Sequence, residues 1–185
     1  MNRILSLCLS LLLIPLACWS QPFLSFESGD LEGWTVTKGE PEVWRLNTSP
    51  GRMAAGTMQE GNVLTSLGMG EAGTGVIRSE VFTIESLLQR FYLAGADGTA
   101  TGTNDGDNNF LHLRSHPDGE ILRSARPPGY HTFESNEWFT GDLIGRKVYL
   151  ELVDSNPQIR GDGFAWIALG GYKQVDNSAL NNPVV

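Results

Sequence analysis

Two short segments of the sequence place polar side chains at every second position, between leucines and valines. In residues 110–114 and 147–153 this alternation puts the leucines and Val148 on the core side of a strand and the polar residues on the other side, which Phe110 shares with His112 and Arg114. The polar set combines a planar guanidinium, a carboxylate and flat rings, which together can hydrogen-bond neighbouring hydroxyl groups in pairs and pack against a sugar ring. If these two strands and the strand-like segment 164–169 are neighbours, one polar sheet face carries the candidate ligand-binding residues, which are His112, Arg114, Tyr149, Glu151 and Trp166.

The same residues also have an ordinary structural interpretation, which the sequence leaves open. Arg114 and Glu151 could form a cross-strand ion pair, and Trp166 could belong to the core. For the other aromatic residues, we expect Trp34 and Trp138 in the core. Trp44 and Tyr130 lie in loop-like segments and are the candidates for exposed aromatics, with Trp44 as the cover of a sheet edge as the alternative.

The sequence contains none of the common motifs of hydrolases and nucleotide-binding enzymes. Gly-x-Ser-x-Gly, His-Glu-x-x-His and the P-loop pattern are all missing. A glycosidase needs two carboxylates about 5–9 Å apart. With 21 acidic residues, some pair satisfies that spacing by chance. We therefore expect no catalytic residues, and a small hydrolase with an unrecognised carboxylate site remains an alternative.

Oxygen-rich side chains cluster in residues 104–109, and Glu27 lies close to Asp30 in the sequence. Calcium takes six to eight oxygen ligands, but the EF-hand register fails here, because the sixth position counted from Asp105 is Phe110 rather than glycine. Turn-forming segments exposed to solvent explain both clusters equally well. We expect no metal ligand and no cofactor, with a structural calcium ion as the alternative.

Short strand-like segments, separated by clusters of Gly, Asn, Asp, Pro and Ser, must position these residues. Helical periodicity is weak, and Asp118-Gly119 marks a hairpin turn between residues 110–114 and 120–125. This pattern predicts an all-β fold, an antiparallel two-sheet sandwich of jelly-roll type. We place the domain at residues 21–175 and a loose tail at 176–185. The other expected strands include residues 23–26, 34–37, 76–84, 89–94, 147–153 and 164–169.

The amino terminus has the pattern of a secretory signal peptide at residues 1–20. Arg3 precedes an apolar run of about 14 residues, which is shorter than the about 20 needed to span a bilayer. No later segment is long and apolar enough, so we expect no transmembrane segment. The predicted location is secreted, periplasmic or extracellular, and lipid attachment at Cys18 is the alternative. Because the cysteines are Cys8 and Cys18, no disulfide framework is expected.

The formal net charge of −8 argues against nucleic acid and anionic membrane surfaces as partners. A carbohydrate or a protein partner is compatible with this charge.

Three segments resemble jelly-roll modules attached to levanases and related glycoside hydrolases of family 32, which also occur in secreted proteins of planctomycete-type bacteria. They are residues 26–34 (FESGDLEGW), 75–84 (GVIRSEVFTI) and 91–98 (FYLAGADG). The resemblance covers about residues 23–172 and implies a non-catalytic, carbohydrate-binding-like sandwich. The levanase-associated pattern ends with Trp-Gly-His-Ile and an aspartate, whereas residues 163–167 read GFAWI. A sugar contact made by that histidine therefore does not carry over.

These observations predict a secreted, non-catalytic bacterial binding module, with carbohydrate as the ligand class that the resemblance implies. An extracellular or envelope module that binds a protein or has a structural role is the alternative.

Overall fold

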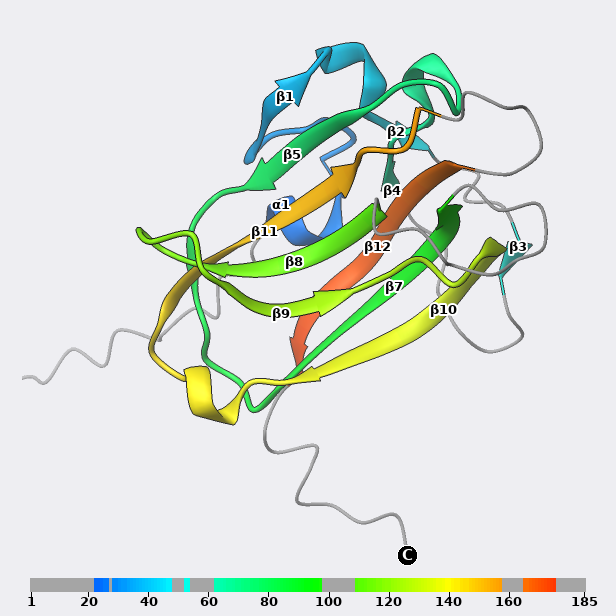
Figure 1. Ribbon diagram of the computed structural model, residues 1–185. Helices are drawn as coiled ribbons and strands as arrows, with labels where there is room; N and C mark the ends of the chain where they lie inside the picture. The colour runs from blue at the N-terminus through cyan, green and yellow to red at the C-terminus, as the bar shows by residue number, and fades with distance from the viewer. Residues whose placement is uncertain are drawn as a thin grey trace, which may run out of the picture.

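The computed structural model describes residues 22–26, 28–47, 52–53, 62–97, 109–157 and 165–175. Two six-stranded sheets stack on each other in this part of the chain (Figure 1). Sheet A has the order β1-β5-β11-β8-β9, and β6 also pairs with β11. Its strands are β1 (Trp34–Gly39), β5 (Gly75–Ser79), β6 (Phe82–Thr83), β8 (Asn109–Ser115), β9 (Ile121–Ala125) and β11 (Lys147–Asp154).

Sheet B has the order β2-β4-β12-β7-β10-β3. Its pairings are antiparallel except for the short β10–β3 pair, which is parallel. Its strands are β2 (Arg45–Asn47), β3 (Arg52–Met53), β4 (Val63–Thr65), β7 (Leu88–Asp97), β10 (Tyr130–Phe139) and β12 (Ala165–Val175). Four single-turn helices complete the described elements, namely α1 (Pro22–Ser25), η1 (Pro41–Val43), η2 (Leu67–Met69) and η3 (Gly141–Leu143). The predicted all-β, two-sheet jelly-roll sandwich is confirmed.

The main core lies between the sheets and follows the two-residue alternation of the strands. Because successive side chains of a strand point to opposite faces, every second residue of β8, β11, β7 and β12 enters this core. The fully buried members include Leu111, Leu113, Val148, Leu150 and Leu152 from sheet A, and Phe91, Leu93, Ile167 and Leu169 from sheet B. Trp34 and Trp138 also belong to it, as predicted.

The hairpin expected around Asp118-Gly119 is confirmed. Strands β8 and β9 pair in antiparallel fashion. In the turn, the Gly119 amide donates to the Ser115 carbonyl oxygen at 2.9 Å, and Gly119 has a φ of +75°. Only glycine adopts that left-handed conformation without strain, so the residue type fixes the place where the chain reverses.

Two strand predictions are wrong in detail. Residues 23–25 belong to a helical turn, α1, and Phe26 directly follows it, so these residues form no strand; Leu24 and Phe26 are buried in the main core. The predicted continuous strand over residues 76–84 is interrupted between β5 and β6. At the interruption Ser79 Oγ accepts a hydrogen bond from the Leu150 amide at 2.9 Å. The break changes the alternation, so Phe82 enters the core instead of sharing the side of Arg78.

Strand β10 and the position of Trp44 were not foreseen. The polar residues in the middle of β10 hide its alternation, and the sequence interpretation placed Tyr130 in a loop. Of the two interpretations of Trp44, an exposed loop residue or a cover for a sheet edge, exposure is wrong, because Trp44 is 3% exposed and lies in the core cluster. Within the described residues, no helix has both the length and the apolar composition to cross a bilayer. The predicted signal peptide, Cys18 and the predicted tail lie outside the described residues.

Candidate functional site

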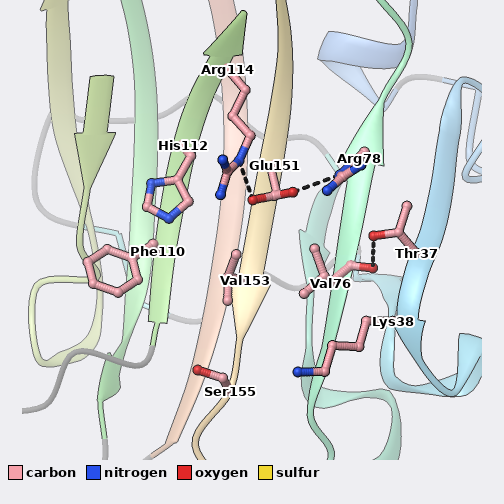
Figure 2. Close-up of a pocket in the computed structure, with 10 residues that line it drawn as sticks. All are labelled: Thr37, Lys38, Val76, Arg78, Phe110, His112, Arg114, Glu151, Val153 and Ser155. Atoms are coloured by element: carbon pink, nitrogen blue, oxygen red, sulfur yellow. Dashed lines mark hydrogen bonds and ion pairs between the residues drawn. The ribbon is translucent and has the colours of Figure 1, made fainter. Parts of the chain in front are cut away.

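The outer face of sheet A, which points away from sheet B, carries a depression of about 570 Å³. Strands β1, β5, β8 and β11 contribute its lining, together with Ser155 directly after β11 (Figure 2). The lining residues are Thr37, Lys38, Val76, Arg78, Phe110, His112, Arg114, Glu151, Val153 and Ser155. We call this depression the sheet A groove.

The strand register brings the polar side chains of the groove together. Glu151 of β11 is paired with His112 on one side and with Arg78 on the other. Tyr149 is paired with Arg114 in the same ladder. Because paired residues have their side chains on the same face, the alternation seen in each segment becomes one continuous polar surface across three strands.

Glu151 is the centre of an Arg–Glu–Arg ion-pair cluster. Its side chain is 4% exposed, and each carboxylate oxygen accepts a hydrogen bond from a different guanidinium. Arg78 Nε donates to Oε2 at 2.7 Å, and Arg114 Nε donates to Oε1 at 2.5 Å. A carboxylate this deeply buried requires such partners, because an unpaired charge away from water is costly.

Both arginines have a second contact that fixes their direction. Arg114 Nη1 donates to the Gly119 carbonyl oxygen at 2.6 Å, which connects the groove to the β8–β9 turn. The Arg78 guanidinium lies 5.3 Å from the ring centroid of Tyr149, in a cation–π contact. Tyr149 is buried and supports Arg78 without lining the groove itself.

Phe110 and His112 form a flat ring platform beside the ion-pair cluster. Their ring centroids are 5.0 Å apart and the ring planes differ by 18°. Figure 2 shows both rings face-on and side by side along β8. The guanidinium of Arg126, in the connection after β9, lies over the Phe110 ring, 5.1 Å from its centroid, in a cation–π contact. The groove therefore combines a flat aromatic surface with oriented hydrogen-bond donors.

The surroundings of His112 favour the neutral form of its imidazole. Burial lowers the pKa of His112 below its usual value, the nearby Arg114 lowers it further, and Glu151 opposes the shift. Nδ1 is buried and has no hydrogen-bond partner among the residues that the structure describes. Since a buried N–H without a partner is rarer than a buried lone pair, this favours the tautomer that carries its proton on Nε2. Neutral His112 then offers an N–H donor at Nε2.

The structure brings His112, Arg114, Tyr149 and Glu151 to one face, and it does not bring Trp166 there. The expectation of a shared face is wrong for Trp166, because β12 belongs to sheet B. Trp166 is buried on the opposite side of the molecule, where it stacks on His131 with ring centroids 5.6 Å apart. The ion pair between Arg114 and Glu151 is present. The ligand-binding role of these residues stays a prediction.

Arg78 and Lys38 are groove residues that the sequence interpretation did not select. Each sits at an outward position of a strand, but strand neighbours cannot be read from alternation alone. Arg78 reaches Glu151 over 73 positions of sequence, through the pairing of β5 with β11. In residues 76–78, Arg78 lies on the opposite side of the strand from the apolar Ile77. This alternation is the sequence signal from which Arg78 could have been selected as an outward residue.

The calcium candidates are not tested by the structure. Glu27 and residues 104–108 lie outside the described residues. In the described part, the Asp30 carboxylate accepts hydrogen bonds from the Ser28 hydroxyl and the Glu32 amide, which is a local turn contact. Among described side chains, no group of three or more His, Cys, Asp and Glu is placed to hold a metal ion.

No protein-family model and no curated protein matches this sequence. Among solved structures, the chain is similar to TmCBM61 in complex with β-1,4-galactotriose, with 14% identity, 81% of this chain and 92% of that chain covered, and a TM-score of 0.47. It is similar to the K1 cleaved adhesin domain of Lys-gingipain from Porphyromonas gingivalis W83, with 14% identity, 82% and 96% covered, and a TM-score of 0.48.

A third similar structure is the C-terminal CBM6 of LamC, a marine laminarinase from Zobellia galactanivorans. Its identity is 11%, the coverage is 74% of this chain and 100% of that chain, and the TM-score is 0.35. Carbohydrate-binding modules are thus among the structural neighbours. At this level of identity the likeness concerns the fold and not the binding residues.

Proposed function

We propose that this chain is a carbohydrate-binding module whose site is the sheet A groove. The observation that carries the proposal is the flat Phe110–His112 platform beside the fixed Arg78–Glu151–Arg114 cluster. The resemblance to levanase-associated modules points to the same ligand class and stays a prediction. We keep secretion and a non-catalytic role as parts of the same proposal.

The physical basis is the two-sided character of a sugar ring. A pyranose has an apolar face of C–H groups and a rim of hydroxyls. The ring platform offers apolar area at little entropic cost, since aromatic side chains have few rotatable bonds. The guanidinium groups next to it are planar and already oriented, so they can donate to adjacent hydroxyl oxygens without losing further freedom.

The groove is equipped for binding rather than for glycoside hydrolysis. Its described lining contains a single carboxylate, that of Glu151, and both oxygens of that carboxylate are engaged by arginines. Hydrolysis by the usual mechanism needs a pair of carboxylates, one of them free to act as an acid. The groove therefore supports the binding function over the hydrolase alternative.

The test is binding to a panel of neutral and acidic polysaccharides, by affinity electrophoresis and then by calorimetry. We expect the wild-type protein to bind at least one glycan, and Phe110→Ala to weaken that binding by about tenfold, as expected for the loss of one aromatic contact. Phe139→Ala is the matched control, because Phe139 is exposed on sheet B. If no glycan binds, or if both variants bind like the wild type, the proposal is wrong and the protein-interaction alternative takes its place.

A further inference from the structure

The sheet A groove is positively charged on a protein that is negatively charged as a whole. Among the described residues, its lining contains Lys38, Arg78 and Arg114, against the single negative charge of Glu151. The chain has a formal net charge of −8. The positive charge in the groove is therefore a local feature and does not follow from the overall composition.

The ion-pair cluster leaves cationic donors facing the groove. Glu151 is satisfied through the Nε atoms of both arginines, so the terminal nitrogens of Arg78 are not used in that contact. The Arg78 side chain is 43% exposed. Lys38 forms no ion pair with any described residue. In Figure 2 its amino group lies on the same side of the groove as Arg78.

Of these cations, Arg78 is oriented before a ligand arrives. Arg78 is held from one side by Glu151 and from another by the ring of Tyr149. A guanidinium that is fixed in this way loses little further freedom when it accepts an anion, and its planar fork matches a carboxylate or sulfate group. A purely neutral ligand would leave Lys38 without an opposite charge, and Arg78 and Arg114 with only the one shared carboxylate of Glu151.

We infer that the sheet A groove binds saccharides that carry an anionic substituent, a carboxylate or a sulfate, which is placed against Arg78 and Lys38. This inference rests on the proposed carbohydrate-binding function and names its ligand class. The sugar ring packs on the Phe110–His112 platform, and the charged substituent lies toward β5 and β1. His112 contributes a neutral N–H donor at the edge of the platform.

The test uses matched pairs of oligosaccharides that differ only in the charged group. The pairs are uronic-acid oligomers with their carboxyl-reduced forms, and sulfated galactans with their desulfated forms. At low salt we expect the charged member of a pair to bind about tenfold more tightly, and this preference to shrink at high salt because exposed charges are screened. The carboxylate and sulfate pairs identify which anion is preferred.

Two lysine variants connect the preference to the groove. Lys38→Gln is expected to reduce the preference for the charged member by about three- to fivefold, since one cation is removed. Lys147→Gln is the matched control, because Lys147 is exposed on β11 outside the groove lining. If the reduced or desulfated members bind equally well, or if Lys38→Gln keeps the full preference, the inference is overturned while carbohydrate binding stands.

Inorganic sulfate separates this inference from simple anion binding. We expect sulfate alone to compete only weakly with the oligosaccharide. If sulfate displaces it as effectively as a charged oligosaccharide does, the groove is an anion site and the saccharide assignment is wrong. If no member of any pair binds, the proposed function itself fails.

Discussion

The two outer faces of the sandwich have opposite characters. On sheet A, outward residues form the charged groove around Glu151. On sheet B, outward residues form a second apolar cluster, buried although it lies on the side away from sheet A. Its members are Val63, Ala94, Phe133, Trp166 and Ala168. The same two-residue alternation produces both faces. An outward position on a strand therefore does not by itself decide whether the side chain is exposed to solvent or can contact a ligand.

The contrast also separates two sources of stability. The apolar cluster on sheet B gains free energy by removing carbon surface from water. The ion-pair cluster on sheet A places a carboxylate away from water and must compensate for that with two guanidinium contacts. Substitutions on sheet B should therefore change stability alone, whereas substitutions on sheet A should change binding as well.

The largest expected effect comes from Phe133, which has no exposed area in the sheet B cluster. Phe133→Ala should lower the free energy of unfolding by about 3–4 kcal/mol, because it removes buried carbon surface and leaves a cavity. Urea denaturation measures this change. Phe139→Ala, at an exposed position of the same strand, should change it by less than about 0.5 kcal/mol. Similar losses for both variants would remove the distinction between buried and exposed positions on this face.

A smaller loss of unfolding free energy is expected for a substitution at Glu151, the centre of the groove. Glu151→Gln keeps the shape of the side chain but removes its charge, which leaves two guanidinium groups without their anion. We expect a loss of about 2 kcal/mol, below the 3–5 kcal/mol of a fully buried pair because Arg78 and Arg114 are partly exposed.

The matched control for Glu151→Gln is Glu137→Gln. Glu137 pairs with Arg90 on sheet B, and both side chains are partly exposed. Such a pair contributes about 0–1 kcal/mol. Equal losses for the two variants in thermal or urea unfolding would contradict the view that Glu151 contributes more to stability because it is buried.

The smallest expected effect is the pH dependence of the unfolding free energy that is due to His112. Its folded-state pKa is lowered, chiefly by burial and next by Arg114. As the pH falls below about 6.5, the unfolded chain binds a proton at this residue before the folded protein does, so the wild type loses stability. His112→Phe lacks this step. The difference in unfolding free energy between wild type and variant should shift against the wild type between about pH 7.5 and pH 5. Parallel pH profiles would show that His112 titrates normally.

The sequence predicted the central side chains of the candidate site better than it predicted which other residues line that site. Alternation within β8 and β11 was sufficient to place His112, Arg114, Tyr149 and Glu151 at outward positions, and the structure brings them together. The same reasoning failed for Trp166, because alternation gives a side of a strand but not the sheet to which the strand belongs. Arg78 was not selected because β11, the strand that carries its partner Glu151, is far away from β5 in sequence.

Local errors of the strand predictions have a related cause. Residues 23–26 are too few for a repeating pattern to distinguish a helical turn from a strand, and both can bury Leu24 and Phe26. At the β5–β6 interruption, a hydrogen bond between the Leu150 amide and Ser79 Oγ replaces a regular ladder contact. A partner 71 positions away decides that change of register, so no inspection of residues 76–84 could reveal it.

The sequence by itself determined the β class, the hairpin at Gly119 and the inward and outward sides of the long strands. These properties depend on side-chain alternation and on backbone preferences, which act over a few residues. Only the tertiary structure decided which outward sides meet, and so which side chains form the groove and which form the second apolar cluster. Strand pairing depends on contacts between distant segments, and burial depends on what finally packs against each face.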